Sequence, residues 1–425
     1  MAIALLSTLD TKGCEIAFLK ACLLELGRTA IVIDVGLFEP DGIVPDVSRF
    51  EVAASAGADI AALIISRPRD EVMSAMGRGA GQLLRRLHAA GHIEGALGIG
   101  GNQGTSIVCA GLRELPLGFP KLVVSTVASG NMRPYVGVSD IAVVFSICDL
   151  LGGANPVSAP VLRNAAAAMA GMSSAPAVSN PNSVPLVAIT ALGNTHPAVA
   201  RSVQLLRAAG LETAAFHASG ACGSAMERLI RAGRVAAVLE ITPHELTEEV
   251  VNAGPYRPAE PGRMTAAADM GIPQVVAPGS VEYLCFGPRE SIPARLRRRA
   301  TVFHNPSNAN VRTSRKEMAA VGRVMAERLN RAKGPVAFVL PLKGWSIYGA
   351  PGGPLHDARA DAAFVRALTR GLRPAICVHR LPLHINDPAF AEYCCELLRG
   401  FLLPGSTDNQ AGVNQAGVKP GAGTA

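Results

Sequence analysis

Short apolar runs alternate with longer amphipathic segments along this chain, and this alternation is the feature that most constrains its fold. In the first half the apolar runs are 2–7, 29–35, 95–100, 121–126 and 141–146, and helical patterns cover 12–26, 70–90, 103–114 and 157–172. Parallel strands need connections long enough to hold a helix. The sequence therefore predicts an α/β protein with parallel sheets.

The opening pattern returns after residue 184. There "PLVAIT" leads into a polar loop, a helix and Gly210, just as "AIALLS" leads into a polar loop, a helix and Gly27. We expect further strands near 235–240, 273–277, 300–303, 335–340 and 375–379. Because 425 residues exceed what one hydrophobic core usually serves, we predict two Rossmann-like, doubly wound parallel-sheet subdomains that face a central cleft.

Local composition indicates where these subdomains end. The stretch 173–185 is rich in Ser, Pro and Asn and poor in charge, which is typical of a linker. We therefore predict a nucleotide-binding subdomain over 1–175 and a second subdomain over 176–404. Residues 405–425 have few large apolar side chains, and we expect this tail to be disordered.

Charge and cysteine content narrow the class of partner and the compartment. The formal net charge of +7 favours small anionic ligands, but the one dense arginine run, 295–299, has no interleaved aromatic residues, so we predict no DNA partner. The nine cysteines include no C-x-x-C pair, as is typical of free thiols in a reducing cytosol. The chain also lacks a basic leader and an apolar run long enough for a membrane span. We expect a cytoplasmic protein with no membrane partner.

Three loops that follow predicted strands in the first half are rich in glycine and hydroxyl groups. They cover 7–13, 98–106 and 125–140. In open α/β sheets, ligands bind outside the carboxyl ends of the strands. The candidate ligand-binding residues are therefore Thr8, Asp10, Thr11, Lys12, Gly100, Gly101, Asn102, Gln103, Gly104, Thr105, Ser125, Thr126, Ser129, Gly130, Ser139 and Asp140.

The middle loop, "GIGGNQGTS", does not match the familiar phosphate-binding motifs. Gln103 stands where the dinucleotide fingerprint has its third glycine, and the chain has no Gly-Lys dipeptide for a Walker motif. An anion nevertheless needs only a close approach past glycine and free amides at a helix start, and 100–105 supplies both. The alternative is a tight turn between a strand and a helix that binds nothing.

The first loop has two interpretations as well. Asp10 or Thr11 could simply cap the following helix. Alternatively, Lys12 contacts a phosphate, while Asp10 or the threonines contact Mg²⁺ or a ribose.

In the second half, a candidate anion nest follows a predicted strand and opens a helix; it comprises His217, Ser219, Gly220, Gly223 and Ser224.

Lys343, His356 and His384 are candidate catalytic residues because they also follow strands, and the histidines could act as acid and base or bind a metal. The structural alternative is that Asp357 and Asp387 cap helices there. The motifs H-E-x-x-H and G-x-S-x-G are absent, so metalloprotease and serine-hydrolase classes are not favoured.

Several longer blocks carry a family resemblance: "TLDTKG", "GIGGNQGTS", "KLVVSTVASGNMRPYVGVSDI", "FHASGACGSAMERLI", "PGGPLHD" and "HINDPAFAE". They resemble the signature blocks of the ATP-binding family of the tomato mosaic virus resistance protein's N-terminal domain, whose bacterial members are stand-alone, uncharacterised proteins. The resemblance spans about 2–402. It implies two α/β subdomains, ATP bound mainly by the first, a homodimer and a TIM-barrel protein partner. Asn102 and Gln103 depart from the small residues more usual in the family.

Two functional hypotheses follow. In the first, the chain binds ATP, with Mg²⁺, and acts as a regulatory or scaffolding partner of a TIM-barrel protein. In the second, it is a metabolic enzyme of the hydrolase or lyase type. Its first half would then hold a phosphorylated or carboxylated substrate on which Lys343, His356 and His384 act.

Overall fold

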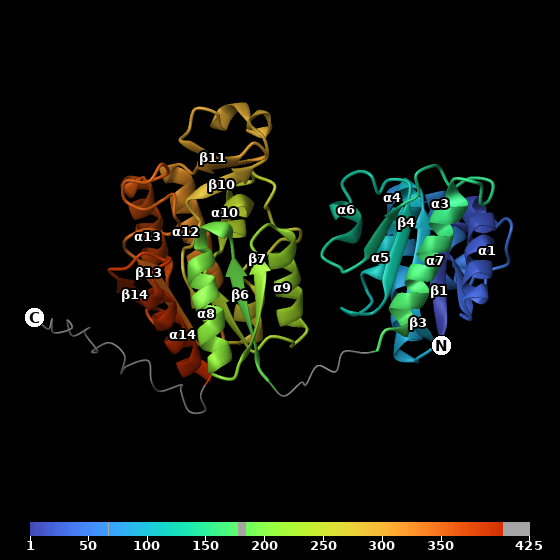
Figure 1. Ribbon diagram of the computed structural model, residues 1–425, viewed down its shortest axis with the longest axis horizontal. Helices are drawn as coiled ribbons and strands as arrows, with labels where there is room; N and C mark the ends of the chain where they lie inside the picture. The colour runs from blue at the N-terminus through green and yellow to red at the C-terminus, as the bar shows by residue number, and fades with distance from the viewer. Residues whose placement is uncertain (67, 177–183, 403–425) are drawn as a thin grey trace, which may run out of the picture. The chain divides into compact units, whose positions relative to one another are not determined.

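The computed structural model describes residues 1–66, 68–176 and 184–402, and the chain divides into two compact units, Met1–Ser179 and Asn180–Ala425. Figure 1 shows a sheet with helices packed against it in each unit. Part of the predicted linker and the whole predicted tail, 405–425, lie outside the described residues. The predicted cleft between the subdomains stays a prediction.

The first unit contains a five-stranded parallel sheet in the order β2-β1-β3-β4-β5. Its strands are β1 (Ala2–Ser7), β2 (Ala30–Asp34), β3 (Ile93–Gly100), β4 (Lys121–Ser125) and β5 (Ala142–Phe145). Its helices are α1 (Leu9–Glu25), α2 (Arg49–Ser55), α3 (Ile60–Ser66), α4 (Arg69–Ala89), α5 (Asn102–Leu112), α6 (Arg133–Val136) and α7 (Ser158–Ser174).

Helices cover both faces of this sheet. Alternate residues of β1 belong to different hydrophobic clusters: Ile3 and Leu5 pack with α1 and α7, whereas Ala4 and Leu6 pack with α2, α4 and α5. A strand buried on both faces is apolar at successive positions, and this explains why β1 appears in the sequence as a continuous apolar run. The predicted doubly wound α/β fold is confirmed for this unit.

The second unit contains a six-stranded parallel sheet in the order β14-β13-β9-β8-β6-β7. Its strands are β6 (Leu186–Ala191), β7 (Glu212–His217), β8 (Ala237–Glu240), β9 (Gln274–Val276), β13 (Val336–Pro341) and β14 (Cys377–Leu381). Its α-helices are α8 (His196–Ala208), α9 (Ala221–Arg231), α10 (His244–Val251), α11 (Ala266–Met270), α12 (Arg315–Asn330), α13 (Ala358–Gly371) and α14 (Pro388–Leu402), and the 3₁₀ turns are Gly193–Thr195, Arg289–Ser291 and Ala294–Leu296.

Starting from β7, this sheet repeats the strand order of the first unit and adds β14 at its far edge. β6 therefore corresponds to β1, and β8 corresponds to β3. It follows that α10, which comes after β8, is the counterpart of α5, which comes after β3. The repeated opening pattern in the sequence thus reflects a repeated sheet topology.

A separate antiparallel sheet in the second unit was not predicted. It consists of β10 (Tyr283–Phe286), β11 (Thr301–Asn305) and β12 (Asn308–Arg312), in the order β10-β12-β11. The strand expected near 300–303 is real, but it belongs to this sheet because a tight turn joins β11 to β12, whereas a parallel neighbour would need a long crossover. Figure 1 shows the small sheet at the end of the unit toward which the β6 arrow points, the carboxyl edge of the parallel strands.

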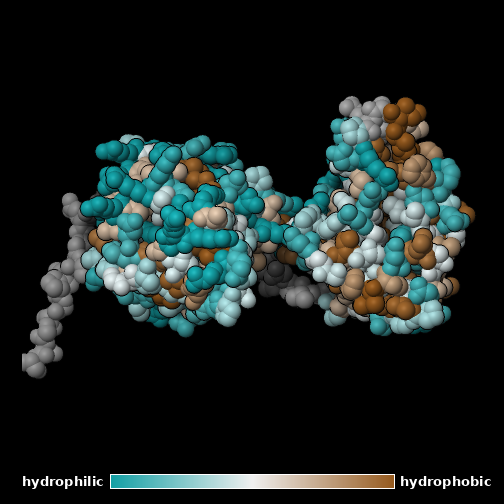
Figure 2. Space-filling view, turned by 90° about the horizontal axis from the view of Figure 1, so that it is seen from above, coloured by the Kyte–Doolittle hydropathy of each residue, from teal (hydrophilic) through white to brown (hydrophobic). Residues whose placement is uncertain are grey.

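The helices also bear on the expectation of no membrane partner. Among the described residues, none of the helices combines the length and apolar character needed to cross a bilayer. Figure 2 shows hydrophilic side chains over much of the face in view, with hydrophobic side chains scattered among them. The cytoplasmic location stays a prediction.

Candidate functional site

The start of α5 lies at the carboxyl edge of the first sheet. Gly100, the last residue of β3, pairs with Ser125, the last residue of β4, so the loops that follow these strands leave the sheet side by side. Gly101 is the N-cap of α5 and makes no side-chain capping bond, because glycine has no side chain. The first turn of a helix has amides without intrahelical partners. The amides at 102–104 are therefore available to an anion.

Hydroxyl groups from the neighbouring loops lie against this first turn. A Cβ atom placed on Gly104 would be 3.5 Å from Oγ1 of Thr8, in the loop after β1. A Cβ atom placed on Gly101 would be 3.8 Å from Oγ1 of Thr126, in the loop after β4. The structure thus brings together predicted residues from all three loops at the start of α5.

Thr105 and Ser125 connect the loops after β3 and β4 through buried hydrogen bonds. Both are fully buried, and their hydroxyl oxygens are 2.6 Å apart. The Thr105 hydroxyl also lies 3.2 Å from the carbonyl oxygen of Gly100, and the amide of Val127 donates to Ser125 Oγ. A Cβ atom on Gly100 would be only 2.4 Å from the Thr105 amide, so glycine is required there. These residues position the loops rather than face a ligand.

The larger residues of the middle loop point outward. Asn102 and Gln103 are exposed, and the Tyr135 hydroxyl of α6 donates to Asn102 Oδ1 at 2.5 Å. Ser129 and Gly130 are also exposed, in the loop after β4. The side chain of Asn102 is therefore bonded to α6, and what Asn102 offers at the start of α5 is its backbone amide.

The charged residues of the first loop have partners within the unit. The buried Lys12 ammonium donates to the Leu150 carbonyl and lies 3.8 Å from Asp149 Oδ1. Asp10 Oδ2 accepts from the Phe38 amide at 3.3 Å. The hydroxyls of Thr8 and Thr11 are 3.1 Å apart. Lys12 is thus engaged with the segment after β5.

Asp34, which the sequence analysis did not single out, caps the start of α1. Its Oδ1 accepts from the amides of Leu9, at 3.2 Å, and Gly36, at 2.8 Å. Its Oδ2 is buried without a partner among the described residues, and burial raises the pKa of this carboxyl. A carboxylate therefore already occupies the start of α1, which leaves α5 as the better anion site. The available signal was an Asp at the end of a predicted strand.

Ser139 and Asp140 lie at the opposite edge of the sheet. Asp140 Oδ1 is 2.8 Å from the ammonium of Lys121, the first residue of β4, and Oδ2 accepts from the Gly118 amide. Burial alone would raise the pKa of Asp140, but the bonds from Lys121 and Gly118 hold it below its usual value. The chain passes through α6 back to the amino edge before β5 begins. These two residues are therefore not brought to the other predicted ligand-binding residues.

The predicted anion nest at the start of α9 holds a carboxylate of the chain itself. Glu245 Oε1 accepts from the amides of Gly220 and Gly223. A Cβ atom on Gly223 would lie 1.6 Å from Glu245 Oε2, so the close approach depends on glycine. The nest is therefore not open to an external anion.

Glu245 belongs to a buried ionic network centred on Arg263. The guanidinium bonds Glu245 at 2.6 Å, Glu227 at 2.9 Å and Glu240 at 2.8 Å. Arg263 is buried, which lowers its pKa, but the three carboxylates outweigh that effect and raise it. The network joins α9, β8 and α10 and has a structural role.

Of the three predicted catalytic residues, His356 lines a cavity of the second unit. This cavity has a volume of about 290 Å³, and its walls include Glu282, Gly344, Gly349, His356, Asp361 and Arg380. Lys343 is exposed and is not among the lining residues. The structure therefore does not bring Lys343, His356 and His384 to one cavity.

The ring of His384 is bonded to backbone on both sides. Its Nδ1 accepts from the Asn386 amide at 3.1 Å, and Nε2 donates to the Ser346 carbonyl at 3.1 Å. Asp387 Oδ2 accepts from the amide of His384, which precedes the helix, so this bond closes the loop and is not the helix cap that the structural alternative expected. His384 therefore fixes the loop after β14.

Glu282 contributes a buried carboxyl to the cavity, and sequence reasoning missed it. Ser346 Oγ donates to Glu282 Oε1 at 2.5 Å, while Oε2 has no partner among the described residues. Burial raises the pKa of Glu282 to about 7, against the lowering influence of Ser346 and Arg312. The exposed His356 bonds through Nδ1 to the Gly349 carbonyl on the same wall. The cavity thus combines an imidazole with a carboxyl that titrates near neutral pH.

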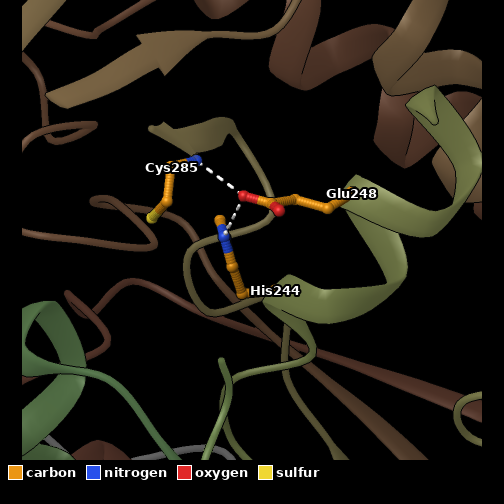
Figure 3. Close-up of side chains that lie close together, drawn as sticks. All are labelled: His244, Glu248 and Cys285. Atoms are coloured by element: carbon orange, nitrogen blue, oxygen red, sulfur yellow. Dashed lines mark hydrogen bonds and ion pairs between the residues drawn. The ribbon is translucent and has the colours of Figure 1, made fainter. Parts of the chain in front are cut away.

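A second group of missed residues is buried in the same unit: His244, Glu248 and Cys285. Figure 3 shows His244 and Glu248 on successive turns of α10, with Cys285 opposite them on β10. Their ligand atoms all lie within 4.8 Å of one another. The signal for the first two was a His and a Glu four residues apart between two predicted strands, a spacing that places both on one face of a helix.

Comparison with known proteins gives matches along almost the whole chain. Models of an uncharacterised protein family, UPF0261, match residues 1–177 with its N-terminal domain and 184–402 with its C-terminal domain. A UPF0261 protein of Clostridium tetani is 39% identical over 390 residues, covering 92% of this chain and 96% of the relative. One of Rhizobium meliloti is 38% identical over 404 residues, covering 95% and 99%.

A plant protein and a solved structure are also similar to parts of the chain. The ToMV resistance protein Tm-1(GCR237) of Solanum lycopersicum is 38% identical over 307 residues, covering 71% of this chain and 40% of the tomato protein. The crystal structure of the glycosyltransferase VinC in complex with dTDP aligns over 94% of this chain and 96% of that chain, at 10% identity and a TM-score of 0.20. The structural likeness is too weak to carry an argument about function.

Proposed function

This chain belongs to the uncharacterised protein family UPF0261, and on that premise we propose that its first unit binds ATP, with the phosphates held at the start of α5. The observation that carries this proposal is the uncapped first turn of α5, against which Thr8 and Thr126 place their hydroxyls. Helix N-termini bind phosphates through free amides and the positive end of the helix dipole. The resemblance of the sequence blocks to an ATP-binding family selects ATP among phosphate compounds.

The neutral character of the site bears on how the phosphates would be bound. The amides of 102–104 and the hydroxyls of Thr8 and Thr126 supply hydrogen bonds but no positive charge, and Lys12 is engaged elsewhere. We therefore include Mg²⁺, bound to the phosphates, in the proposal. Asp10, which follows β1 at the same edge, is its candidate protein ligand.

A regulatory or scaffolding role fits this kind of site better than phosphoryl transfer. The described groups around the start of α5 are amides and hydroxyls, with no histidine or unpaired lysine among those brought together. A homodimer and a TIM-barrel protein partner, both implied by the family resemblance, stay predictions within this proposal.

Calorimetry with the full chain tests the proposal. ATP, ADP and AMP are titrated with and without Mg²⁺, and we expect the affinity to fall as phosphates are removed. In Gly101→Val the new side chain enters the space before α5, and we expect at least a tenfold loss of ATP affinity. Because the nearest atom to a Cβ at Gly101 is 3.8 Å away and the backbone there is extended, the variant should fold normally.

The matched control is Gly193→Val, an exposed glycine of the second unit whose Cβ would meet no atom within 4 Å. Its ATP affinity should equal that of the parent protein. Lack of measurable binding by any adenine nucleotide would refute the proposal. Unchanged affinity in Gly101→Val would place the ligand elsewhere.

A second candidate function, acid–base catalysis on a small molecule, is favoured by the cavity of the second unit. Glu282 offers a carboxyl with a pKa near the operating pH, which is the condition for efficient proton transfer. Arg380 lines the same cavity and would attract a carboxylate or phosphate of the substrate. In this candidate Glu282 and His356 act as the acid–base pair, and Lys343 and His384 are left out.

A further inference from the structure

The counterparts α5 and α10 present opposite chemistry. The first turn of α5 carries no acidic residue, whereas α10 begins with His244 and Glu245 and continues with Glu248 and Glu249. Carboxylates at this position repel anions and attract cations. Glu245 and Glu249 are already paired with Arg263 and Arg328, which leaves Glu248 as the acidic group of α10 that faces His244.

The surroundings of His244 fix the role of each ring nitrogen. His244 Nδ1 lies 2.7 Å from the carbonyl oxygen of Ser280, and a carbonyl can only accept, so Nδ1 carries the hydrogen. The other nitrogen, Nε2, is 3.2 Å from Glu248 Oε1. In a neutral imidazole this nitrogen presents a lone pair to the carboxylate.

Glu248 accepts backbone hydrogen bonds through both of its carboxyl oxygens. Its Oε1 accepts from the Cys285 amide at 2.7 Å, and its Oε2 accepts from the Tyr256 amide at 2.6 Å. Both side chains of the His244–Glu248 pair are fully buried, and among the described ion pairs Glu248 has His244 as its partner. Nε2 and Oε1, 3.2 Å apart in a fully buried pair, need a proton or a metal ion between them.

Cys285 supplies a third donor atom. Its thiol is buried and donates to Asn310 Oδ1 at 3.4 Å across the strand pair, and its Sγ lies within 4.8 Å of the ligand atoms of His244 and Glu248. Thiolate, imidazole and carboxylate together form a donor set typical of zinc, with bonds of about 2.0 to 2.3 Å. Such bonds place ligands roughly 3.3 to 3.8 Å apart, so small side-chain rotations would complete the site.

We propose that His244 Nε2, Glu248 Oε1 and Cys285 Sγ bind one Zn²⁺ ion, with the fourth tetrahedral position left to a non-protein ligand (Figure 3). Metal-binding histidines commonly donate their other N–H to a carbonyl, which is the role of Ser280 here, and ligating carboxylates are themselves hydrogen-bonded. The ion joins α10 to β10, and through them the parallel sheet to the small antiparallel sheet.

Metal analysis of the full chain tests this proposal. Because the site is buried, the protein is produced in medium supplemented with Zn²⁺ or Co²⁺ and purified without chelators. We expect one metal ion per chain. The Co²⁺ form should show the visible absorption of a tetrahedral site and a near-ultraviolet thiolate-to-cobalt band.

Two cysteine variants separate the site from adventitious binding. Cys285→Ser is nearly isosteric, so it should keep the far-ultraviolet circular dichroism spectrum while losing the thiolate band and most of the metal. Cys109→Ser, at a buried thiol of the first unit, should keep the thiolate band and the bound metal. Two results would overturn the proposal: metal content in the parent protein no higher than in Cys285→Ser, or a thiolate band that persists in that variant. The first result would leave His244 as an imidazolium paired with Glu248.

The metal and the proposed ATP site have separate readouts. Metal content is measured without nucleotide, and the ATP titration uses Gly101→Val in the other unit. Either proposal can therefore fail while the other stands.

Discussion

Single residues in this chain owe their chemical behaviour to neighbours that are distant in sequence. Burial raises the pKa of the Glu282 carboxyl to about 7, against the lowering influence of Ser346 and Arg312. The sequence predicts His384 as a catalytic candidate, but both of its ring nitrogens are hydrogen-bonded to backbone groups. Residue type and position after a strand predicted that these loops carry polar groups, but the tertiary contacts that decide each role are absent from the sequence pattern.

The titration of Glu282 predicts a pH-dependent stability. Its carboxyl takes up a proton near pH 7 in the folded chain and near 4.5 in the unfolded chain. Between these values the folded state binds more protons, so the free energy of unfolding falls as the pH rises. Glu282→Gln cannot titrate. Relative to this variant, the parent protein should lose about 3 kcal/mol between pH 4.5 and 7.

Urea unfolding of both proteins across this pH range measures the difference. Glu290→Gln, at an exposed glutamate, is the control and should follow the parent protein at every pH. Parallel curves for the parent protein and Glu282→Gln would show that Glu282 has an ordinary pKa, and the second candidate function would lose its acid–base group.

At the scale of elements, the helix starts differ in whether a side chain already occupies them. Amides at the starts of α1 and α9 donate to the carboxyl groups of Asp34 and Glu245, whereas α5 starts at a glycine with no side-chain cap. The sequence predicted the long strands and helices well, because buried parallel strands and amphipathic helices have clear periodicity. It missed β10, β12, α2 and α3, which are short, and short elements depend on packing more than on pattern.

The close fit of α9 over Glu245 predicts opposite effects for two helical glycine substitutions. In Gly223→Ala the new Cβ would lie 1.6 Å from Glu245 Oε2 and 2.6 Å from Arg263 Nε, so the buried network must separate. We expect a loss of roughly 3 to 5 kcal/mol in the free energy of unfolding, as when a buried ion pair is broken.

Gly171→Ala in α7 is the matched control, because its Cβ would meet no atom within 4 Å and the residue is exposed. Alanine is the better helix former, so this variant should gain up to about 1 kcal/mol. Denaturant unfolding measures both variants. A mild effect of Gly223→Ala would mean that α9 can shift away from Glu245 at little cost.

At the scale of the whole molecule, each unit has its own hydrophobic cores. Two of the clusters among the described residues lie wholly within Met1–Ser179, and the other five lie wholly within Asn180–Ala425. The composition of the chain and the repeated pattern predicted two α/β subdomains. The common strand order could not be obtained from the sequence, since it depends on which strands pair across long crossovers.

Separate cores predict that each unit folds alone. Fragments 1–176 and 184–402 should each unfold cooperatively in urea, and each should keep its helical circular dichroism signal. Their m-values should reflect the surface that each buries, with the larger value for 184–402. A fragment that is unfolded at zero urea would contradict the assignment of independent cores.

The carboxylates of α10 have a consequence for stoichiometry. A chain built from two sheets of the same strand order invites the expectation of two equivalent nucleotide sites. The helix that corresponds to α5 carries Glu245 and Glu248 in place of neutral residues, so the proposed phosphate site has no equivalent at the start of α10. A saturating nucleotide titration should therefore end at one molecule per chain.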